Sequence, residues 1–256
     1  MNEGEKNELL FKIYLCYLKR EKDQNSPFGL IESLGFDKIN FNDLPQRFDF
    51  STLQEDEEIL NTCKNLNIGK SSPSNKADVE INGIKYSVKF INAAPPSIIN
   101  HTTRKGFVRI ANKLNLNIND LDEIINQYWD LRIAKKITED CGNNNSLSPF
   151  KDNKEILRPY LEYFCFSGTG KADSKNQADS LVKFKTFDDI NTWKIYSKSE
   201  TVDEIWSGLY FCMRDISKGG VKDYENNPEK NIIEPWTRYS SSKYRGALSV
   251  RYKSSG

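Results

Sequence analysis

Histidine is almost missing from this sequence, which holds a single imidazole, that of His101, among 256 residues. One imidazole excludes a His-Cys zinc site, an HNH nuclease, a two-histidine phosphodiesterase and a multi-histidine metal centre. A Ser-His-Asp hydrolase also lacks support, because no G-x-S-x-G elbow is present to hold the serine. We expect His101 to be an ordinary polar residue of a loop or helix start, with a contact to a phosphate or a base as the alternative.

Cysteines are few as well: there are five, an odd number, and no two have the C-x-x-C spacing of zinc or redox sites. This use of cysteine fits a reducing cytoplasm. The N-terminus lacks the positive region of a signal peptide, and its apolar stretch at residues 9–18 is interrupted by Lys12. Because that stretch is also shorter than the ~20 residues that span a bilayer, we expect a cytoplasmic protein without a membrane segment.

Acidic residues are absent from two long stretches, although the whole chain has 36 of them and a net charge of +1. Residues 90–119 and 235–256 contain no Asp or Glu but several Lys and Arg. A protein that binds a polyanion can gather basic groups on one face while its total charge stays near zero. The two stretches therefore predict a polyanion-binding surface, with a pair of solvated loops as the alternative.

The rest of the composition, with 37% hydrophobic and 29% charged residues, is typical of a folded chain that needs no disulfide or structural metal. No internal repeat or low-complexity tract divides it, so a single domain over residues 1–256 is the simplest account. Periodicity and propensity predict helices over residues 5–20, 30–34, 55–66 and 120–137, and strands over residues 180–185, 193–196 and 248–252.

A hairpin is predicted over residues 77–90, where two alternating runs flank Asn82-Gly83. Both positions of a type I′ turn need positive φ, and Asn-Gly is the strongest short signal for such a turn. The two-residue turn also fixes the register of the two strands. In that register Asp78 faces Ser87, Val79 faces Tyr86, Glu80 faces Lys85 and Ile81 faces Ile84.

Strand alternation gives this hairpin one apolar and one polar face. Asp78, Ser87 and Lys89 share the polar face and are close enough to cluster. A surface hairpin with a wet face produces the same pattern by chance and stays the alternative. The residues expected in the core are Val79, Ile81, Ile84, Tyr86 and Val88.

A carboxylate beside a lysine supplies the protein's share of phosphodiester hydrolysis, which needs a cation at the phosphate oxygens and a positioned water. Asp78 would hold Mg²⁺, a cation that prefers oxygen ligands and keeps several waters. Lys89 would position the attacking water, and Ser87 would form hydrogen bonds there without adding charge. The three side chains form a candidate catalytic group.

This arrangement resembles the PD-(D/E)XK nucleases, in particular the type II restriction endonucleases. The family pattern is an aspartate at the start of one strand and a (D/E)-x-K tripeptide on the next, matched by Asp78 and by Ser87, Val88 and Lys89. Ala77 stands where the pattern has proline, and Ser87 replaces the second carboxylate, as an uncharged residue does in some restriction enzymes. The resemblance implies an α/β fold, a restriction-endonuclease-like mixed β-sheet flanked by α-helices, in one nuclease domain.

The same resemblance implies a magnesium-dependent enzyme that cuts double-stranded DNA at a short specific sequence, with a cognate DNA methyltransferase as its genetic partner. A homodimer is an assembly that this expectation leaves open. Glu8, on the N-terminal helix, is a candidate for the missing carboxylate at the metal, although a helix-start charge that complements the dipole also explains it. Glu80 is the other candidate, but it is expected to pair with Lys85. A non-catalytic DNA-binding module, and a nuclease of the same fold in repair or RNA processing, remain the alternative functions.

The expected DNA contacts come from three segments. Residues 166–171 do not form a nucleotide-binding loop, because Cys165 and Ala172 stand where that motif needs Gly and Ser or Thr, and this Gly-rich turn is expected to approach DNA instead. Residues 235–256 alternate basic and aromatic residues, which favours a recognition element, with an edge strand guarded by charge as the alternative. The predicted DNA-binding residues are Arg104, Lys105, Arg109, Lys171, Arg238, Lys243, Arg245 and Arg251.

Overall fold

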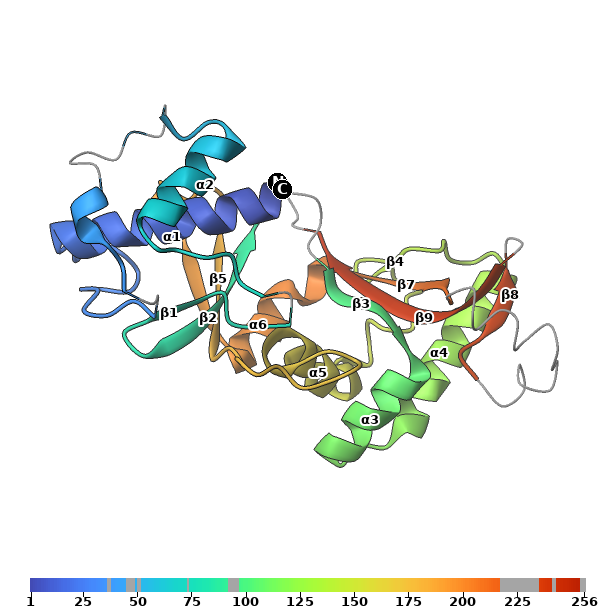
Figure 1. The fold of residues 1–256 in the computed structure, drawn as a ribbon. Coiled ribbons are helices and arrows are strands. Elements are labelled where there is room, and N and C mark those ends of the chain that lie inside the picture. The colour runs from blue at the N-terminus through green and yellow to red at the C-terminus, as the bar shows by residue number, and fades with distance from the viewer. Residues whose placement is uncertain are drawn as a thin grey trace. The chain divides into compact units, whose positions relative to one another are not determined.

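The computed structural model describes residues 1–35, 38–44, 49, 52–72, 74–91, 97–216, 235–240 and 243–253. Contacts group the chain into two compact units: unit 1 comprises Met1–Ala94 and Ser174–Thr201, and unit 2 comprises Pro95–Asp173 and Val202–Gly256. Figure 1 labels the elements of both. The single nuclease domain stays a prediction. Residues 92–96 and 217–234 are among those outside the described residues.

Unit 1 is built on a mixed sheet in the order β1–β2–β5–β6. β1 (Val79–Ile81) pairs antiparallel with β2 (Ile84–Phe90), and β2 pairs parallel with β5 (Ser180–Phe184). β6 (Lys194–Ser197) pairs antiparallel with β5. β2 is therefore a central strand, and the side chains that it carries have neighbours on both sides.

The first helix, α1 (Glu3–Glu21), packs on one face of this sheet and also against α2 (Asp56–Asn65). Asn2 begins α1 with a capping box. Phe11 of α1 stacks on Phe184 of β5, with ring centroids 5.1 Å apart. Figure 1 shows α1 in dark blue crossing the strands. Contacts on two sides explain why this helix is apolar nearly all round.

Unit 2 holds an antiparallel sheet in the order β3–β9–β7–β4, with β8 paired to β9. One face of this sheet is apolar: Phe211 of β7 stacks on Phe150, with ring centroids 4.1 Å apart. The opposite face carries Tyr210 and Arg251, which are registered across from each other. The strands are β3 (Ser97–Thr103), β4 (Cys141–Gly142), β7 (Leu209–Asp215), β8 (Arg238–Ser240) and β9 (Lys243–Tyr252).

Helices supply the rest of the core of unit 2. Trp236, just before β8, is fully buried and its ring lies 4.9 Å from that of Phe107 in α3. Trp129 of α4 donates its indole N–H to the carbonyl of Trp236 at 2.9 Å. These helices are α3 (Arg104–Leu114), α4 (Ile118–Ile133) and α5 (Lys154–Glu162), and α6 (Lys198–Ile205) follows β6 in the chain.

The architecture is α/β, with one mixed and one antiparallel sheet flanked by helices. The helices expected at 5–20, 55–66 and 120–137 are confirmed as α1, α2 and α4, and the expected strands form β5, β6 and part of β9. The helix expected at residues 30–34 is wrong, because Leu34 makes an isolated bridge to Ile81 instead. His101 lies inside β3 with φ 39°, not in a loop or helix start.

A search of the described helices for one long and apolar enough to cross a membrane finds none. The cytoplasmic location stays a prediction.

Candidate functional site

The hairpin turn has the geometry that its Asn-Gly pair predicts. Asn82 has φ 52° and Gly83 has φ 79°, both positive as a type I′ turn requires. Ile84, expected in the core, is 44% exposed because it directly follows this turn. The predicted register is confirmed for Val79 with Tyr86, Glu80 with Lys85 and Ile81 with Ile84.

The predicted pairing of Asp78 with Ser87 is not among the registered pairs of the two strands. Asp78 lies just before β1, where the regular pairing ends. Its backbone N–H donates to the carbonyl of Tyr86 at 2.8 Å, although Tyr86 is already registered opposite Val79. Its carboxylate accepts the backbone N–H of Val88 at 2.7 Å and so takes the place of a strand carbonyl. The half-buried side chain of Asp78 is thereby held toward β2.

Ser87 and Lys89 both lie near this carboxylate. Ser87 Oγ is 3.5 Å from Asp78 Oδ2, at the long end of hydrogen bonding. Ser87 is buried, so the polar face of the hairpin is only partly exposed to solvent. Lys89 is half-buried and forms no ion pair with a described residue, but its ammonium is close enough to lower the pKa of Asp78. Lys183 of β5 is registered beside Lys89. The structure therefore brings Asp78, Ser87 and Lys89 together, and their catalytic roles stay predictions.

Glu8 approaches this group from α1 through Lys12 and Ser71. Lys12, only 2% exposed, donates its ammonium to Glu8 Oε1 at 2.6 Å, to the carbonyl of Gly69 at 3.0 Å and to Ser71 Oγ at 3.0 Å. Ser71 donates its backbone N–H to Glu8 Oε1 and its hydroxyl to the carbonyl of Asp78, both at 3.0 Å. Ser71 thus connects the helix that carries Glu8 to the strand end that carries Asp78.

The electrostatics of Asp78 reflect the charges around it. Burial raises the pKa of this carboxyl, the ammonium of Lys89 opposes the rise, and the carboxylate of Glu8 adds to it. The N–H of Val88 and the ammonium of Lys12 oppose the rise of this pKa more weakly. A cation bound here would offset the energetic cost of burying the charge of Asp78 and would screen its repulsion by Glu8.

The donor set fits a hard cation held by few protein ligands. Within the described part of the chain, no group of three or more His, Cys, Asp and Glu side chains could hold a metal ion. Mg²⁺ does not need such a cage, because it is usually held through one or two carboxylates and keeps several waters. Asp78 and Glu8 are two carboxylates, and each uses only one of its oxygens in the hydrogen bonds of the described residues.

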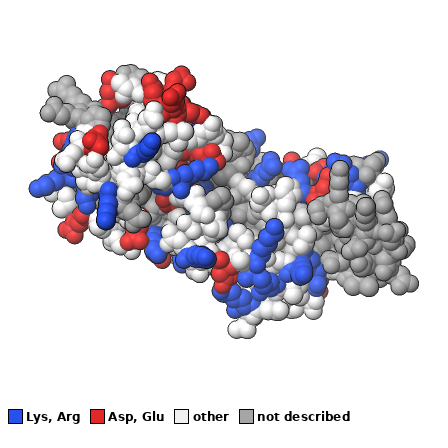
Figure 2. Space-filling view, in the orientation of Figure 1, with Lys and Arg blue, Asp and Glu red and all other residues white. Residues whose placement is uncertain are grey.

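Basic side chains gather over α3 in unit 2, at the lower edge of the view in Figure 2. Arg104 is engaged internally, since its guanidinium donates to both oxygens of Asp122 at 2.9 and 2.7 Å. Asp122 also accepts the indole N–H of Trp236 at 2.7 Å. The next residue, Lys105, is exposed and has no partner among the described residues. Lys105 therefore presents an exposed charge, whereas the charge of Arg104 is bound to Asp122.

Arg109 holds the Gly-rich turn in place. Its guanidinium donates to the carbonyl of Thr169 at 2.6 Å, to the hydroxyl of Tyr163 at 2.6 Å and to Asp173 at 3.1 Å. Lys171, in the same turn, is exposed. Of the two predicted DNA-binding cations at this turn, Arg109 of α3 is bonded internally and Lys171 is exposed.

The predicted cations of the C-terminal strands divide in the same way. Arg238 donates to nearby backbone carbonyls and to an asparagine side chain of α4. Arg245 forms an ion pair with Glu139, and Lys243 pairs with an aspartate of β7 at 2.9 Å. Arg251 is exposed and has no partner among the described residues. Residues 241, 242 and 254–256 of the predicted recognition element lie outside the described residues.

Sequence reasoning missed Lys12 and Ser71 as parts of the site. Lys12 interrupts the apolar stretch of α1, and that interruption is the signal, because an ammonium on a helix buried all round must find acceptors. Ser71 has no comparable signal, since it lies in a polar loop whose path depends on tertiary contacts.

Comparisons of the chain with protein-family models, with curated proteins and with solved structures find no match. Its function therefore has to be inferred from the chemistry of its own side chains.

Proposed function

We propose that the chain is a magnesium-dependent endonuclease that hydrolyses double-stranded DNA at a specific sequence, as type II restriction endonucleases do. One observation carries the proposal: the half-buried carboxylate of Asp78 is held at 2.7 Å against β2, the strand that carries Lys89, and Ser71 joins the backbone of Asp78 to the carboxylate of Glu8 through hydrogen bonds of 3.0 Å. Metal-assisted phosphodiester hydrolysis needs such groups from a protein, and here they are two acids and a lysine contributed by α1 and the hairpin.

Each of these side chains has a distinct role in the proposal. Asp78 and Glu8 would hold Mg²⁺, which when bound neutralises charge on the phosphate oxygens. Lys89 would orient the attacking water and stabilise the negative charge that develops on it. Ser87 would add a hydrogen bond without charge. Lys12 already offsets the charge of Glu8, so the group is balanced before any cation binds.

The architecture of unit 1 supports this proposal at a coarse level. Asp78 and Lys89 lie on neighbouring antiparallel segments of a mixed sheet that packs against α1, as the resemblance to the PD-(D/E)XK nucleases implies. A restriction-endonuclease-like fold, and a DNA methyltransferase as genetic partner, belong to the same proposal.

Several exposed cations are available to the backbone of DNA. Lys105, Lys171 and Arg251 are exposed and have no ion-pair partner among the described residues. They can neutralise phosphates without breaking an internal bond, and the release of counterions from DNA favours this contact. Arg104, Arg109 and Arg245 would first have to leave their present partners.

The test is incubation of the protein with a sequenced plasmid and Mg²⁺, beside Asp78→Ala, Lys89→Ala and the control Lys64→Ala on the exposed surface of α2. We expect discrete fragments from the wild type and from Lys64→Ala, and cleavage slowed at least ~100-fold in the other two. Removal of Mg²⁺ with a chelator should abolish cleavage. Cleavage that survives in both site variants would remove the assigned site.

Other outcomes favour the alternative functions. Sequence-specific DNA binding without cleavage at any divalent metal concentration would favour a binding module. Degradation without discrete fragments would favour a repair nuclease, and cleavage of RNA alone would favour RNA processing.

A further inference from the structure

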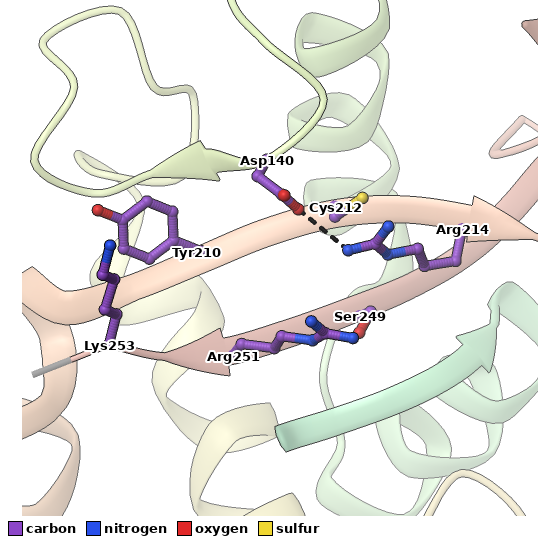
Figure 3. A pocket seen from close by; sticks show the side chains of 7 residues that line it. All are labelled: Asp140, Tyr210, Cys212, Arg214, Ser249, Arg251 and Lys253. Carbon is purple, nitrogen blue, oxygen red and sulfur yellow. Dashed lines mark hydrogen bonds and ion pairs between the residues drawn. The ribbon is translucent and has the colours of Figure 1, made fainter. Parts of the chain in front are cut away.

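A pocket of about 210 Å³ lies on the sheet of unit 2, on the face opposite to Phe211. Figure 3 shows its lining side chains, which come from β7, from β9 with Lys253 just after it, and from Asp140 just before β4. None of these belongs to the hairpin that carries Asp78. The polar side chains of its lining include Asp140, Tyr210, Arg214, Ser249, Arg251 and Lys253.

Strand register explains why these side chains meet. Tyr210 is registered opposite Arg251, and Cys212 is registered opposite Ser249, so alternate residues of two neighbouring strands point to one face. Phe211 and the residue paired with it, Val250, are fully buried on the other face. The pocket is therefore built by the same alternation that builds the core.

The charges in the pocket are not balanced. Arg214 is matched, because it pairs with Asp140 at 3.1 Å and with Glu139 at 3.3 Å. Arg251 and Lys253 are exposed and face no acidic partner among the described residues. Figure 3 shows the side chain of Arg251 extending along the sheet toward Ser249, and that of Lys253 lying beside Tyr210. With three cations and one acid in its lining, the pocket has a net charge of +2.

We propose that this pocket binds a phosphate group, and that its source is the backbone of the DNA substrate. A guanidinium can bind two oxygens of a phosphate at once, while an ammonium and a hydroxyl can each reach another. A phosphate offers more oxygens to such a set than a carboxylate does. The pocket is smaller than the ~300–1,000 Å³ of sites for whole cofactors, which fits a single group of a larger ligand.

Apolar contacts suit the same ligand. The ring of Tyr210 and the aliphatic stems of Arg251 and Lys253 line the pocket beside the charged groups. A deoxyribose next to the bound phosphate would pack on such a surface. The DNA source of the phosphate rests on the proposed function, whereas the affinity for phosphate does not.

The experiment measures binding of a short DNA duplex at several salt concentrations without divalent metal, so that no cleavage occurs. Arg251→Ala and Lys253→Ala are compared with Lys64→Ala, which removes one charge from the exposed surface of unit 1. We expect each pocket variant to bind about 3- to 10-fold more weakly and to lower the slope of log K against log salt by about 1. Lys64→Ala should match the wild type. Inorganic phosphate is titrated separately into the wild type and both pocket variants.

The outcomes separate this proposal from the nuclease assignment. Duplex binding unchanged in both pocket variants would overturn the pocket and leave the Asp78 site untouched. If the wild type binds inorganic phosphate but not the duplex, and both pocket variants lose the binding of phosphate, a phosphate site is supported and DNA is overturned as the source of the phosphate. Binding of neither ligand would overturn the pocket. If both pocket variants bind the duplex more weakly, while Asp78→Ala in the same assay binds it as the wild type does, the pocket is supported.

Discussion

The carboxylate of Asp78 accepts the backbone N–H of Val88 at 2.7 Å, so the side chain with the proposed chemical role also completes the ladder of the hairpin. A hydrogen bond to a charged group contributes about 1.5–3 kcal/mol to stability. Any substitution of Asp78 therefore changes two properties, the stability of the strand pair and the chemistry at its end, and these have to be measured separately.

Asp78→Asn and Asp78→Ala separate them. Asparagine keeps an oxygen that can accept the N–H of Val88 but has no charge. We expect the free energy of unfolding of Asp78→Asn to lie within about 1 kcal/mol of the wild-type value. We expect this variant to cut DNA at least ~100-fold more slowly. Asp78→Ala should lose a further ~1–2 kcal/mol, because the N–H then has no acceptor. Denaturant unfolding and plasmid cleavage measure the two effects. If Asp78→Asn cuts DNA at the wild-type rate, the carboxylate has a structural role only.

The ion pair between the buried Lys12 and the partly buried Glu8 should be strongly coupled. Lys12→Met removes the donor to Glu8 Oε1 and to the carbonyl of Gly69. We expect this to lower the free energy of unfolding by about 3 kcal/mol or more, because the charge of Glu8 is left unpaired. The double variant Glu8→Gln/Lys12→Met should lose less than the two single variants together, because no charge is left unpaired. Unfolding of all four proteins in denaturant tests this, with Lys64→Met as an exposed control. Strictly additive losses would contradict the coupling.

Arg104 and Lys105 are adjacent, yet we expect opposite effects from their removal. Arg104→Ala leaves Asp122 without its two guanidinium bonds and should destabilise unit 2 by about 2–3 kcal/mol. Lys105→Ala should change stability by less than about 0.5 kcal/mol but lower the salt slope of DNA binding by about 1. Thermal unfolding and binding titrations of both variants check this. A stable Arg104→Ala protein that loses DNA binding would reverse the assignment.

Asp173 should make the stability of unit 2 depend on pH in acid. Hydrogen bonds from Lys113, Tyr163 and Arg109 hold the pKa of Asp173 below its ordinary value. The folded state then binds this proton more weakly than the unfolded state, so the carboxylate stabilises the fold above about pH 4 and this contribution is lost as the pH falls toward the lower, folded-state pKa. Asp173→Asn should thus be less stable than the wild type at pH ~7, and the difference should shrink in acid. A difference independent of pH, in unfolding measured across this range, would contradict the mechanism.

The register of the hairpin could be predicted for the three pairs nearest the turn, because the turn is specified locally. Asn82 and Gly83 supply the two positive φ angles, and the alternation on either side then decides which residues face the core. β7 was not predicted, because its sequence does not alternate between apolar and polar residues. Tyr210 and Cys212, on the face opposite to Phe211, are aromatic or apolar in character. β3 was missed for another reason: an irregularity between Ile99 and Thr102 interrupts its pairing with β9 and its alternation.

The candidate site was predictable only where it depends on that turn. Asp78 and Lys89 follow from the register, but the approach of Glu8 depends on Ser71, in a loop that only tertiary contacts position. The basic stretches show the same limit. The sequence shows how many cations residues 90–119 contain. It does not show that Arg104 is bound to Asp122 while the side chain of Lys105 is exposed to solvent.

The core of unit 1 draws on two distant parts of the chain, since Phe11 packs against Phe184 and Trp193, which belong to the second segment, Ser174–Thr201. A ribosome therefore releases α1 long before the aromatic partners of that helix have been translated. The nascent N-terminal segment has to keep an apolar helix from aggregating while much of unit 2 is still being made. We expect chaperone dependence during synthesis for this reason, and a fragment that stops before β5 should be insoluble even though it contains the whole hairpin that carries Asp78 and Lys89.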